Sequence, residues 1–196
     1  GDVTAIAGAM SLNKNNLLGI AMGTSEAVGY VDKNGCVTGW LNELAFVPVD
    51  AAPGAMRDEW SGDIGCGVKY FSQDSVAKLA GFAGVEFTAD MPNAERLKTI
   101  QRLAEEGNAE AAAIYRSIGT YLAHSLALYY DYYHYDNVLL LGRVMSGRGG
   151  NIIISTCKSV LTDEYPELAD IISIEIPNES FRRVGQSVAA ASLPQI

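Results

Sequence analysis

The sequence predicts an α/β domain built around a mixed β-sheet. Near the start, three strand-like runs follow one another as a meander: residues 17–21, 27–31 and 36–40. The Asn34-Gly35 pair favours a tight hairpin between the last two runs. Apolar residues then recur at every fourth position over 108–130, which indicates a long helix. The apolar run 138–141, ended by a glycine, is typical of a central strand buried on both faces.

Helices and one more strand account for most of the remaining chain. Ser72 and Asn178 are candidate helix caps, and a loop with little periodicity is expected over 48–67. The expected helices cover residues 72–80, 93–106 and 180–191, with a helix or mixed segment at 152–161 and a strand at 171–176. Residues 2–10 also have a helical pattern, with Asp2 as a candidate N-cap.

The composition predicts one soluble domain. The chain has 196 residues, 48% of them hydrophobic, which suffices for one well-filled core. Its net charge of −9 disfavours nucleic acid and anionic membranes as partners, and no apolar run approaches the roughly 20 residues of a membrane-spanning helix. The three cysteines lack paired spacing, which favours a reducing compartment, so we expect a cytoplasmic protein.

A glycine and two hydroxyl residues occupy the turn between the first two predicted strands. Gly23, Thr24 and Ser25 have the chemistry to present backbone N–H groups and hydroxyls to a phosphate. The same residues also suit an ordinary turn. Taken alone, this motif therefore leaves both interpretations open.

Further motifs accompany this turn in a fixed order along the chain. The segments are the Asp2 helix start, Met22-Gly23-Thr24-Ser25-Glu26-Ala27-Val28-Gly29, Asn42-Glu43-Leu44-Ala45-Phe46-Val47-Pro48-Val49, Glu59-Trp60-Ser61-Gly62-Asp63-Ile64-Gly65-Cys66, the helix around Gly119 to Ala127, and Leu141-Gly142-Arg143-Val144-Met145-Ser146. In this order they resemble the motifs of ROK proteins (repressor, open reading frame, kinase), and the resemblance covers nearly the whole chain.

The resemblance implies an actin/hexokinase-like (ribonuclease H-like) lobe. Residues 1–196 would form the C-terminal lobe of a two-lobe sugar kinase whose N-terminal lobe is missing from this chain, so this chain alone should be inactive. Asp2 would be the general base toward a sugar hydroxyl, although an N-cap role explains it too. Gly23, Thr24 and Ser25 would hold the phosphates of ATP, supplied with Mg²⁺. Gly142 would let the backbone approach the adenosine.

The resemblance also implies a sugar site, with Glu43 accepting hydrogen bonds from sugar hydroxyls. A solvated loop carboxylate is an equally good interpretation of Glu43. The family's histidine and the glutamate after its last cysteine, which also contact the sugar, are Phe46 and Val68 here. We therefore expect an altered sugar pocket.

Other departures from the family pattern bear on ATP and zinc. The family's hairpin glycines are largely replaced, and Glu26 would place negative charge near a triphosphate. A tetrahedral zinc site needs four nitrogen or sulfur ligands. The family's zinc positions hold one thiol only, so we expect no structural zinc: the residues are Phe46, Glu59, Ser61 and Cys66.

Two alternatives to an active kinase remain. A non-enzymatic, sugar-binding regulator uses the same lobes in this family, and a degenerate kinase would bind a ligand without turnover. A homodimer through this lobe is a further possibility that the resemblance suggests. His124 and His134 lie far from any cysteine pair, and we expect structural roles for them. Cys36 and Cys157 have no neighbouring base in the sequence, so nothing favours a nucleophilic role.

Overall fold

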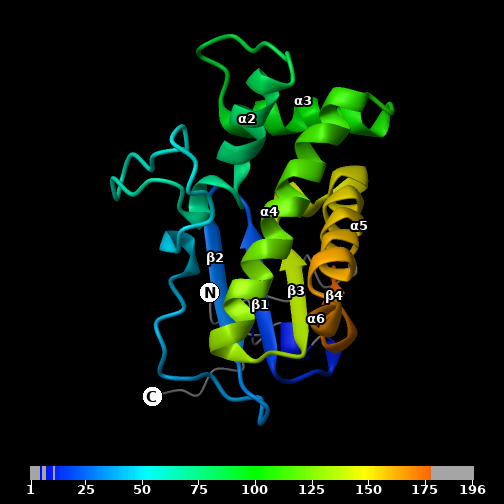
Figure 1. Cartoon of the computed structure of the whole chain (residues 1–196). Helices are drawn as coiled ribbons and strands as arrows, with labels where there is room; N and C mark the ends of the chain where they lie inside the picture. The colour runs from blue at the N-terminus through cyan, green and yellow to red at the C-terminus, as the bar shows by residue number, and fades with distance from the viewer. Residues whose placement is uncertain (1–4, 6–7, 11, 178–196) are drawn as a thin grey trace.

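The computed structural model describes residues 5, 8–10 and 12–177 of the chain (Figure 1). Helix 2–10 with its Asp2 cap lies mostly outside the described residues, as does the closing helix predicted at 180–191. The described elements are, in order, β1 (Leu17–Met22), β2 (Glu26–Val31), η1 (Leu44–Phe46), η2 (Gly67–Lys69), α2 (Gln73–Phe82), α3 (Asn93–Glu105), α4 (Ala109–Tyr133), β3 (Asn137–Leu141), η3 (Arg143–Met145), α5 (Gly147–Glu164), α6 (Pro166–Ile171) and β4 (Ser173–Glu175).

The four strands form one mixed sheet in the order β2-β1-β3-β4. β1 and β2 are an antiparallel hairpin whose register runs from the pair Leu17 and Val31 to the pair Met22 and Glu26. β3 runs parallel to β1 on one side and to β4 on the other. Because β3 sits between two strands and is buried, the prediction of a central strand at 138–141 is confirmed.

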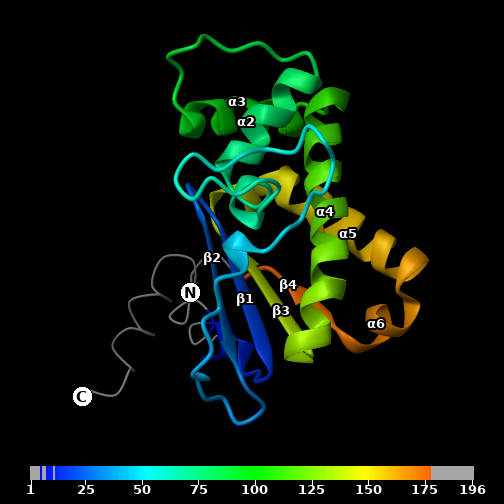
Figure 2. The same cartoon turned by 60° about the vertical axis from the view of Figure 1, so that its left-hand side comes forward.

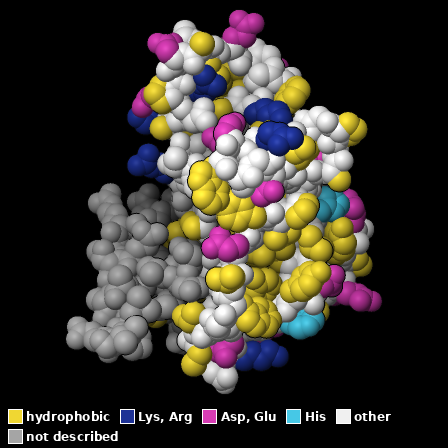
Figure 3. Space-filling model, turned by 90° about the vertical axis from the view of Figure 1, so that its left-hand side faces the viewer, with side chains coloured by type: hydrophobic (Ala, Val, Ile, Leu, Met, Phe, Trp, Pro, Cys, Tyr) yellow, Lys and Arg dark blue, Asp and Glu magenta, His cyan; other side chains and the backbone are white. Residues whose placement is uncertain are grey.

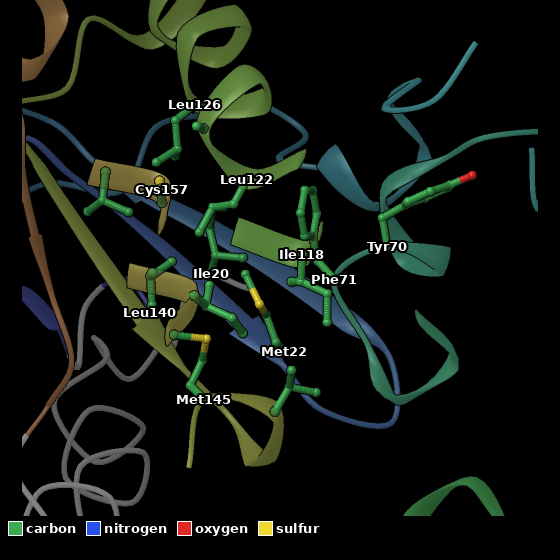
Figure 4. Close-up of a cluster of buried hydrophobic side chains, with 14 of the residues drawn as sticks. Ile20, Met22, Tyr70, Phe71, Ile118, Leu122, Leu126, Leu140, Met145 and Cys157 are labelled. Carbon is green, nitrogen blue, oxygen red and sulfur yellow. The ribbon is translucent and has the colours of Figure 1, made fainter. Parts of the chain in front are cut away.

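One face of the sheet is covered by α4 and α5, which lie on the same side of it (Figure 2). Figure 4 shows side chains of α4, such as Leu122 and Leu126, above Ile20 of β1 and Leu140 of β3. These side chains are fully buried, so this layer is the main core. The apolar residues that predicted a long helix at 108–130 are the residues that face it.

The opposite face of the sheet carries a second, smaller cluster. Leu17, Val31 and Leu139 point to this side, where Ala5 packs against them. Strand alternation explains the division, because neighbouring residues of a strand point to opposite faces. Of the described residues before β1, Ala5 and the partly buried Ala9 and Leu12 therefore cover the back of the sheet.

The prediction of a third meander strand at residues 36–40 is wrong. Residues 36–40 contribute only one isolated bridge, between Val31 and Val37. The chain then leaves the sheet, and Trp40 packs against the rings of Tyr30 and Tyr133 at 6.3 and 5.3 Å between ring centroids. Aromatic contacts to α4 replace the expected strand pairing.

Tertiary contacts also shift two boundaries near the C-terminal end. α5 begins at Gly147, five residues before the predicted segment, and its first turns pack on α4, where Gly149 lies directly against the ring of Tyr115 and leaves no room for a side chain. Residue 171 ends α6, which Pro166 begins, so β4 is shorter than the predicted strand. The loop at 48–67 and the helices at 72–80 and 93–106 are confirmed within one or two residues.

α2 and α3 lie beyond the end of the sheet to which β1 and β3 point (Figure 1). In the part of the chain that the structure describes, no helix combines the length and the apolar character that crossing a membrane requires.

The close approach of α4 and α5 depends on Gly119. A methyl group there would lie 2.6 Å from the carbonyl oxygen of Ile153 and 2.9 Å from Cβ of Thr156, so the two helices would have to move apart. We expect Gly119→Ala to lower the free energy of unfolding by about 1–3 kcal/mol in urea titrations. Gly81→Ala is the matched control, because nothing lies within 4 Å of its added methyl group. An equal effect of both substitutions would contradict this account of the helix contact.

Candidate functional site

The carboxyl ends of β1 and β3 meet at one edge of the sheet. Because the two strands are parallel, Gly23 after β1 and Gly142 after β3 lie side by side there. The edge of a parallel sheet at its carboxyl end is where α/β proteins commonly bind ligands. The structure thus brings together two sequence-predicted positions that are more than a hundred residues apart.

The contact between the turn after β3 and the end of β1 requires a glycine at position 142. Its φ of 100° lies in a region that favours glycine, and a methyl group on it would overlap the backbone of Met22. The missing side chain allows the turn after β3 to touch the end of β1. Whatever binds at this edge can approach backbone on both sides.

The turn between β1 and β2 is stabilised by a hydrogen bond within the turn and by one from α2. The Gly23 N–H donates to the carbonyl oxygen of Ser25 at 3.0 Å, and the Gln73 N–H donates to the carbonyl oxygen of Gly23 at 2.9 Å. Thr24 and Ser25 are exposed. The Ser25 hydroxyl donates to the carbonyl oxygen of Glu26 at 3.4 Å, which leaves its oxygen as an acceptor. The turn that presents both residues is anchored to the first residue of α2.

α3 joins the same edge through polar contacts. Gln101 Nε2 donates to the carbonyl oxygen of Arg143 at 2.7 Å, and the Arg148 N–H donates to Glu105 Oε1 at 2.6 Å. These bonds tie α3 to η3 and to the start of α5. The sequence pattern did not identify Gln101 or Glu105, because a polar residue that contacts another element cannot be distinguished in the sequence from one that faces solvent.

Glu43 lies away from the glycine pair, at the start of η1. Its side chain is exposed, and its carbonyl oxygen accepts from the Phe46 N–H at 3.1 Å. The next residue, Leu44, packs toward β2, so Glu43 is placed beside the hairpin rather than on it. Asp2, the predicted base, lies outside the described residues.

Glu26 does not have the position that the sequence suggested. Its side chain is 5% exposed, and neither carboxylate oxygen has a hydrogen-bond partner among the described residues. Burial raises the pKa of Glu26 from 4.5 to about 8, because an ionised carboxylate is poorly solvated there. The expectation of negative charge beside a bound triphosphate is therefore corrected: at neutral pH this carboxyl is mostly protonated and faces the interior.

A lysine occupies the centre of the segment where the resemblance implied a zinc loop. The buried Lys69 Nζ contacts the Glu59 carboxylate, Asp74 Oδ2 at 2.6 Å and Asp58 Oδ1 at 3.5 Å. These groups raise the pKa of Lys69 despite its burial, and Lys69 in turn helps to lower the pKa of Glu59. An ammonium group thus links the loop to α2.

The residues at the family's zinc positions do not fit a metal. Phe46 packs against Trp60, with 5.8 Å between ring centroids, and the Glu59 carboxylate is taken by Lys69. The Cys66 thiol is buried, and burial raises its pKa, whereas a zinc ligand must be a thiolate. Over the described ranges, no three His, Cys, Asp or Glu side chains gather so as to hold an ion.

The two histidines have structural contacts. His124 Nδ1 lies 2.9 Å from the hydroxyl of Tyr165, which joins α4 to the end of α5. His134 ends α4 in the left-handed conformation with a φ of 49°, and its N–H donates to the carbonyl oxygen of Tyr130.

A hydrophobic groove of about 590 Å³ lies on the outer side of η1, where Figure 3 shows yellow side chains gathered. Its described lining contains no charged side chain and consists of Trp40, Leu41, Leu44, Val47, Pro48, Leu128, Tyr129, Tyr132 and Tyr133. The groove therefore offers no cation to a phosphate. The edge with Gly23 and Gly142, in contrast, presents the exposed hydroxyl residues Thr24 and Ser25.

Comparison with solved structures identifies the architecture. A ROK family transcriptional regulator, a homologue of the E. coli MLC protein, superposes with a TM-score of 0.73 at 17% identity, over 96% of this chain and 50% of its own. The ROK hexokinase from Thermus thermophilus gives 0.70 at 15% identity, over 96% and 62%. The chain has the ROK fold.

A ROK family glucokinase from Streptomyces griseus, solved in complex with glucose and AMPPNP, gives a TM-score of 0.71 at 15% identity, over 96% of this chain and 65% of its own. This chain thus spans half to about two thirds of the length of these ROK proteins. No protein-family model and no curated protein matches it by sequence. The α/β fold with a mixed sheet, predicted as actin/hexokinase-like, is confirmed.

The Lys69 cluster yields a test of what holds the loop. We expect Lys69→Met to lower the free energy of unfolding by about 1–3 kcal/mol, because it leaves carboxylates at a partly buried site without their cation. Lys98→Met is the control: it breaks the exposed pair with Glu95 and should change stability by less than about 0.5 kcal/mol. Both are measured by urea unfolding. If Lys69→Met were as mild as Lys98→Met, the lysine would not be what secures the loop.

Proposed function

We propose that this chain is the nucleotide-side, C-terminal lobe of a two-lobe ROK-type protein that transfers a phosphoryl group from ATP to a sugar or sugar derivative. The observation that carries the proposal is the meeting of Gly23 and Gly142 at the carboxyl edge of β1 and β3 in a chain with the ROK fold. A hairpin turn with exposed hydroxyl residues next to a glycine turn suits a phosphate chain followed by a nucleoside.

In this proposal, the chain's residues position the reactants. The exposed hydroxyls of Thr24 and Ser25 and the N–H groups of their turn bind phosphate oxygens, and the Gly142 turn lies along the adenosine. Asp2 accepts the proton of the attacking sugar hydroxyl, and Glu43 binds other hydroxyls. Phosphoryl transfer depends mainly on such positioning and on charge stabilisation. Mg²⁺ would arrive with the nucleotide and neutralise phosphate charge.

The N-terminal lobe belongs to the proposal as well. The ROK relatives are longer than this chain, and a cleft between two lobes would exclude water from the transfer. The described part of this chain offers one side of such a cleft. We therefore propose that this chain alone is inactive, and that the whole protein is a cytoplasmic enzyme, possible also as a homodimer.

A sugar-binding regulator is the second candidate. One of the structural relatives is a ROK transcriptional regulator, and in this chain Ser25 and Ala27 replace glycines of the phosphate hairpin. A regulator or a degenerate kinase needs ligand binding without turnover. Ligand binding and turnover must therefore be measured separately.

The deciding measurement is ADP release by the full-length protein with Mg-ATP against a panel of hexoses and amino sugars. For a kinase, one sugar class stimulates release, and Asp2→Asn abolishes the stimulation because no base receives the hydroxyl proton. Sugar binding without ADP release would instead support the regulator or the degenerate kinase.

Nucleotide binding tests the hairpin directly. We expect Thr24→Val to weaken Mg-AMPPNP binding by the full-length protein roughly 5- to 30-fold in calorimetry, the loss of one hydrogen bond to a charged group. Thr38→Val, in the turn beyond β2, is the control and should leave the affinity unchanged. Equal affinities for both variants would remove the phosphate role from the β1–β2 turn.

A further inference from the structure

Glu26 is a buried acid that neither the proposed transfer nor any ion pair uses. It begins β2, directly after the turn with Thr24 and Ser25, and pairs across the hairpin with Met22. From there its side chain points into the main core side of the sheet, as Val28 and Tyr30 do. Since neither of its oxygens is bonded to a described residue, the carboxyl has no compensation for lost solvation.

The carboxyl packs against the loop segment that contains η1 and η2. A methyl group on Gly67 would lie 2.5 Å from Glu26 Oε2 and 2.8 Å from the carbonyl oxygen of Leu44. The absent side chain of Gly67 thus leaves the space that the carboxyl fills, and the Leu44 carbonyl oxygen faces the same small space. A protonated carboxyl is compatible with a neighbouring carbonyl oxygen, whereas a carboxylate repels it.

We propose that Glu26 is a positioning residue: its protonated carboxyl allows residues 44–67 to pack closely against the β1–β2 hairpin, and loss of the proton releases this segment. The segment is the part that can yield, because β2 is bonded within the sheet while the bridges of the segment are isolated ones, Pro48 to Cys66 and Arg57 to Ile64.

The described elements around Glu26 offer no cation to its ionised form. On α4, the titratable group that faces it is Tyr129, whose pKa is raised by burial and further by Glu26. η1 has no titratable side chain, and Lys69 of η2 is engaged by Asp58, Glu59 and Asp74. β1 contributes Met22, and α2 contributes the neutral Gln73 at its start. No nearby positive charge on these described elements therefore stabilises an ionised Glu26 in its buried position.

The direction of the pH effect follows from the two states. Glu26 has a pKa of about 8 in the closed state and close to 4.5 once exposed. The closed state is fully favoured below pH 4.5, and opening becomes about tenfold more frequent for each pH unit from there to about 8. Above pH 8 both states are ionised, and the opening equilibrium levels off.

Release would carry a functional consequence because Glu43 lies at the edge of this segment. That consequence rests on the proposed function, in which Glu43 binds sugar hydroxyls beside the phosphate hairpin. Sugar affinity would then fall with rising pH while nucleotide binding at Gly23 to Ser25 persists. The release itself is independent of any ligand.

Amide hydrogen exchange of the whole chain without ligands, between pH 5.5 and 9 and corrected for intrinsic exchange, tests the release. In the native chain we expect protection factors of residues 44–67 to fall about tenfold per pH unit up to about pH 8 and then to level off. Amides of β3 and α4 exchange through openings of higher free energy, so they should stay better protected than residues 44–67 at every pH, although openings that also expose Glu26 become easier over the same range. In Glu26→Gln the protection of 44–67 should not change with pH.

Two further variants keep the test decisive. Glu43→Gln, an exposed carboxylate of the same region, should behave as the native chain. If Glu26→Gln does not fold, Glu26→Met supplies an uncharged side chain of similar length, and its 44–67 protection should likewise be independent of pH. Unchanged protection of 44–67 in the native chain overturns the proposal, as does equal protection of 44–67, β3 and α4 at every pH, which would mean that only global unfolding exposes Glu26. Neither result bears on ADP release or on the Thr24→Val affinity.

Discussion

The parallel pairing of β1 with β3 is the contact on which the candidate site depends. It joins residues 17–22 to residues 137–141, so every group at the sheet edge is placed by a pairing between distant segments. β3 is buried on both faces, with α4 and α5 on one side and the segment before β1 on the other. Burial on two faces fixes its register, because a shift by one residue would exchange the two faces. The fixed register also fixes the positions of the turns that follow β1 and β3.

Glycines allow the close backbone packing around this pairing. Gly142 allows the turn after β3 to lie on the backbone of Met22, and Gly119 and Gly149 allow α4 and α5 to pack closely behind the sheet. Each of these positions excludes a side chain for a different packing reason. Gly142 and Gly119 lie against backbone, whereas Gly149 lies against the ring of Tyr115, so both the sheet edge and the helix layer depend on close packing that leaves no room for a side chain.

The long segment between β2 and α2 is organised by charge and burial instead of by regular pairing. Lys69 joins three carboxylates at the place where the ROK pattern has a metal, and Phe46 and Trp60 pack where the pattern has a histidine and a neighbour of the first cysteine. The uncharged Glu26 fills the space beside Gly67. An ion cluster and a buried acid both respond to pH and salt, whereas a closed zinc site responds to chelators. An ion cluster and a buried acid, and no bound metal of the ROK pattern, thus account for the packing of the described segment next to the proposed sugar site.

The sequence by itself determined the class of the fold and the elements whose residues carry a strong local pattern. The apolar repeat of α4, the cap Ser72 of α2 and the uninterrupted run of β3 each predict their element, because local periodicity and capping act over a few residues. The order of the motifs also placed Gly23 and Gly142 as candidates. What the sequence did not provide was any measure of their separation.

Only the tertiary structure decided which residues meet and in which charge state. Residues 36–40 leave the sheet, and Trp40 packs against the rings of Tyr30 and Tyr133. The β-propensity of these residues cannot predict such a contact, because it depends on residues distant in the sequence. Glu26 reads as a solvated carboxylate in the sequence, yet the folded chain buries it, since strand alternation turns it toward the core. Solvation and pairing energies depend on neighbours far along the chain, and those neighbours exist only after the fold has formed.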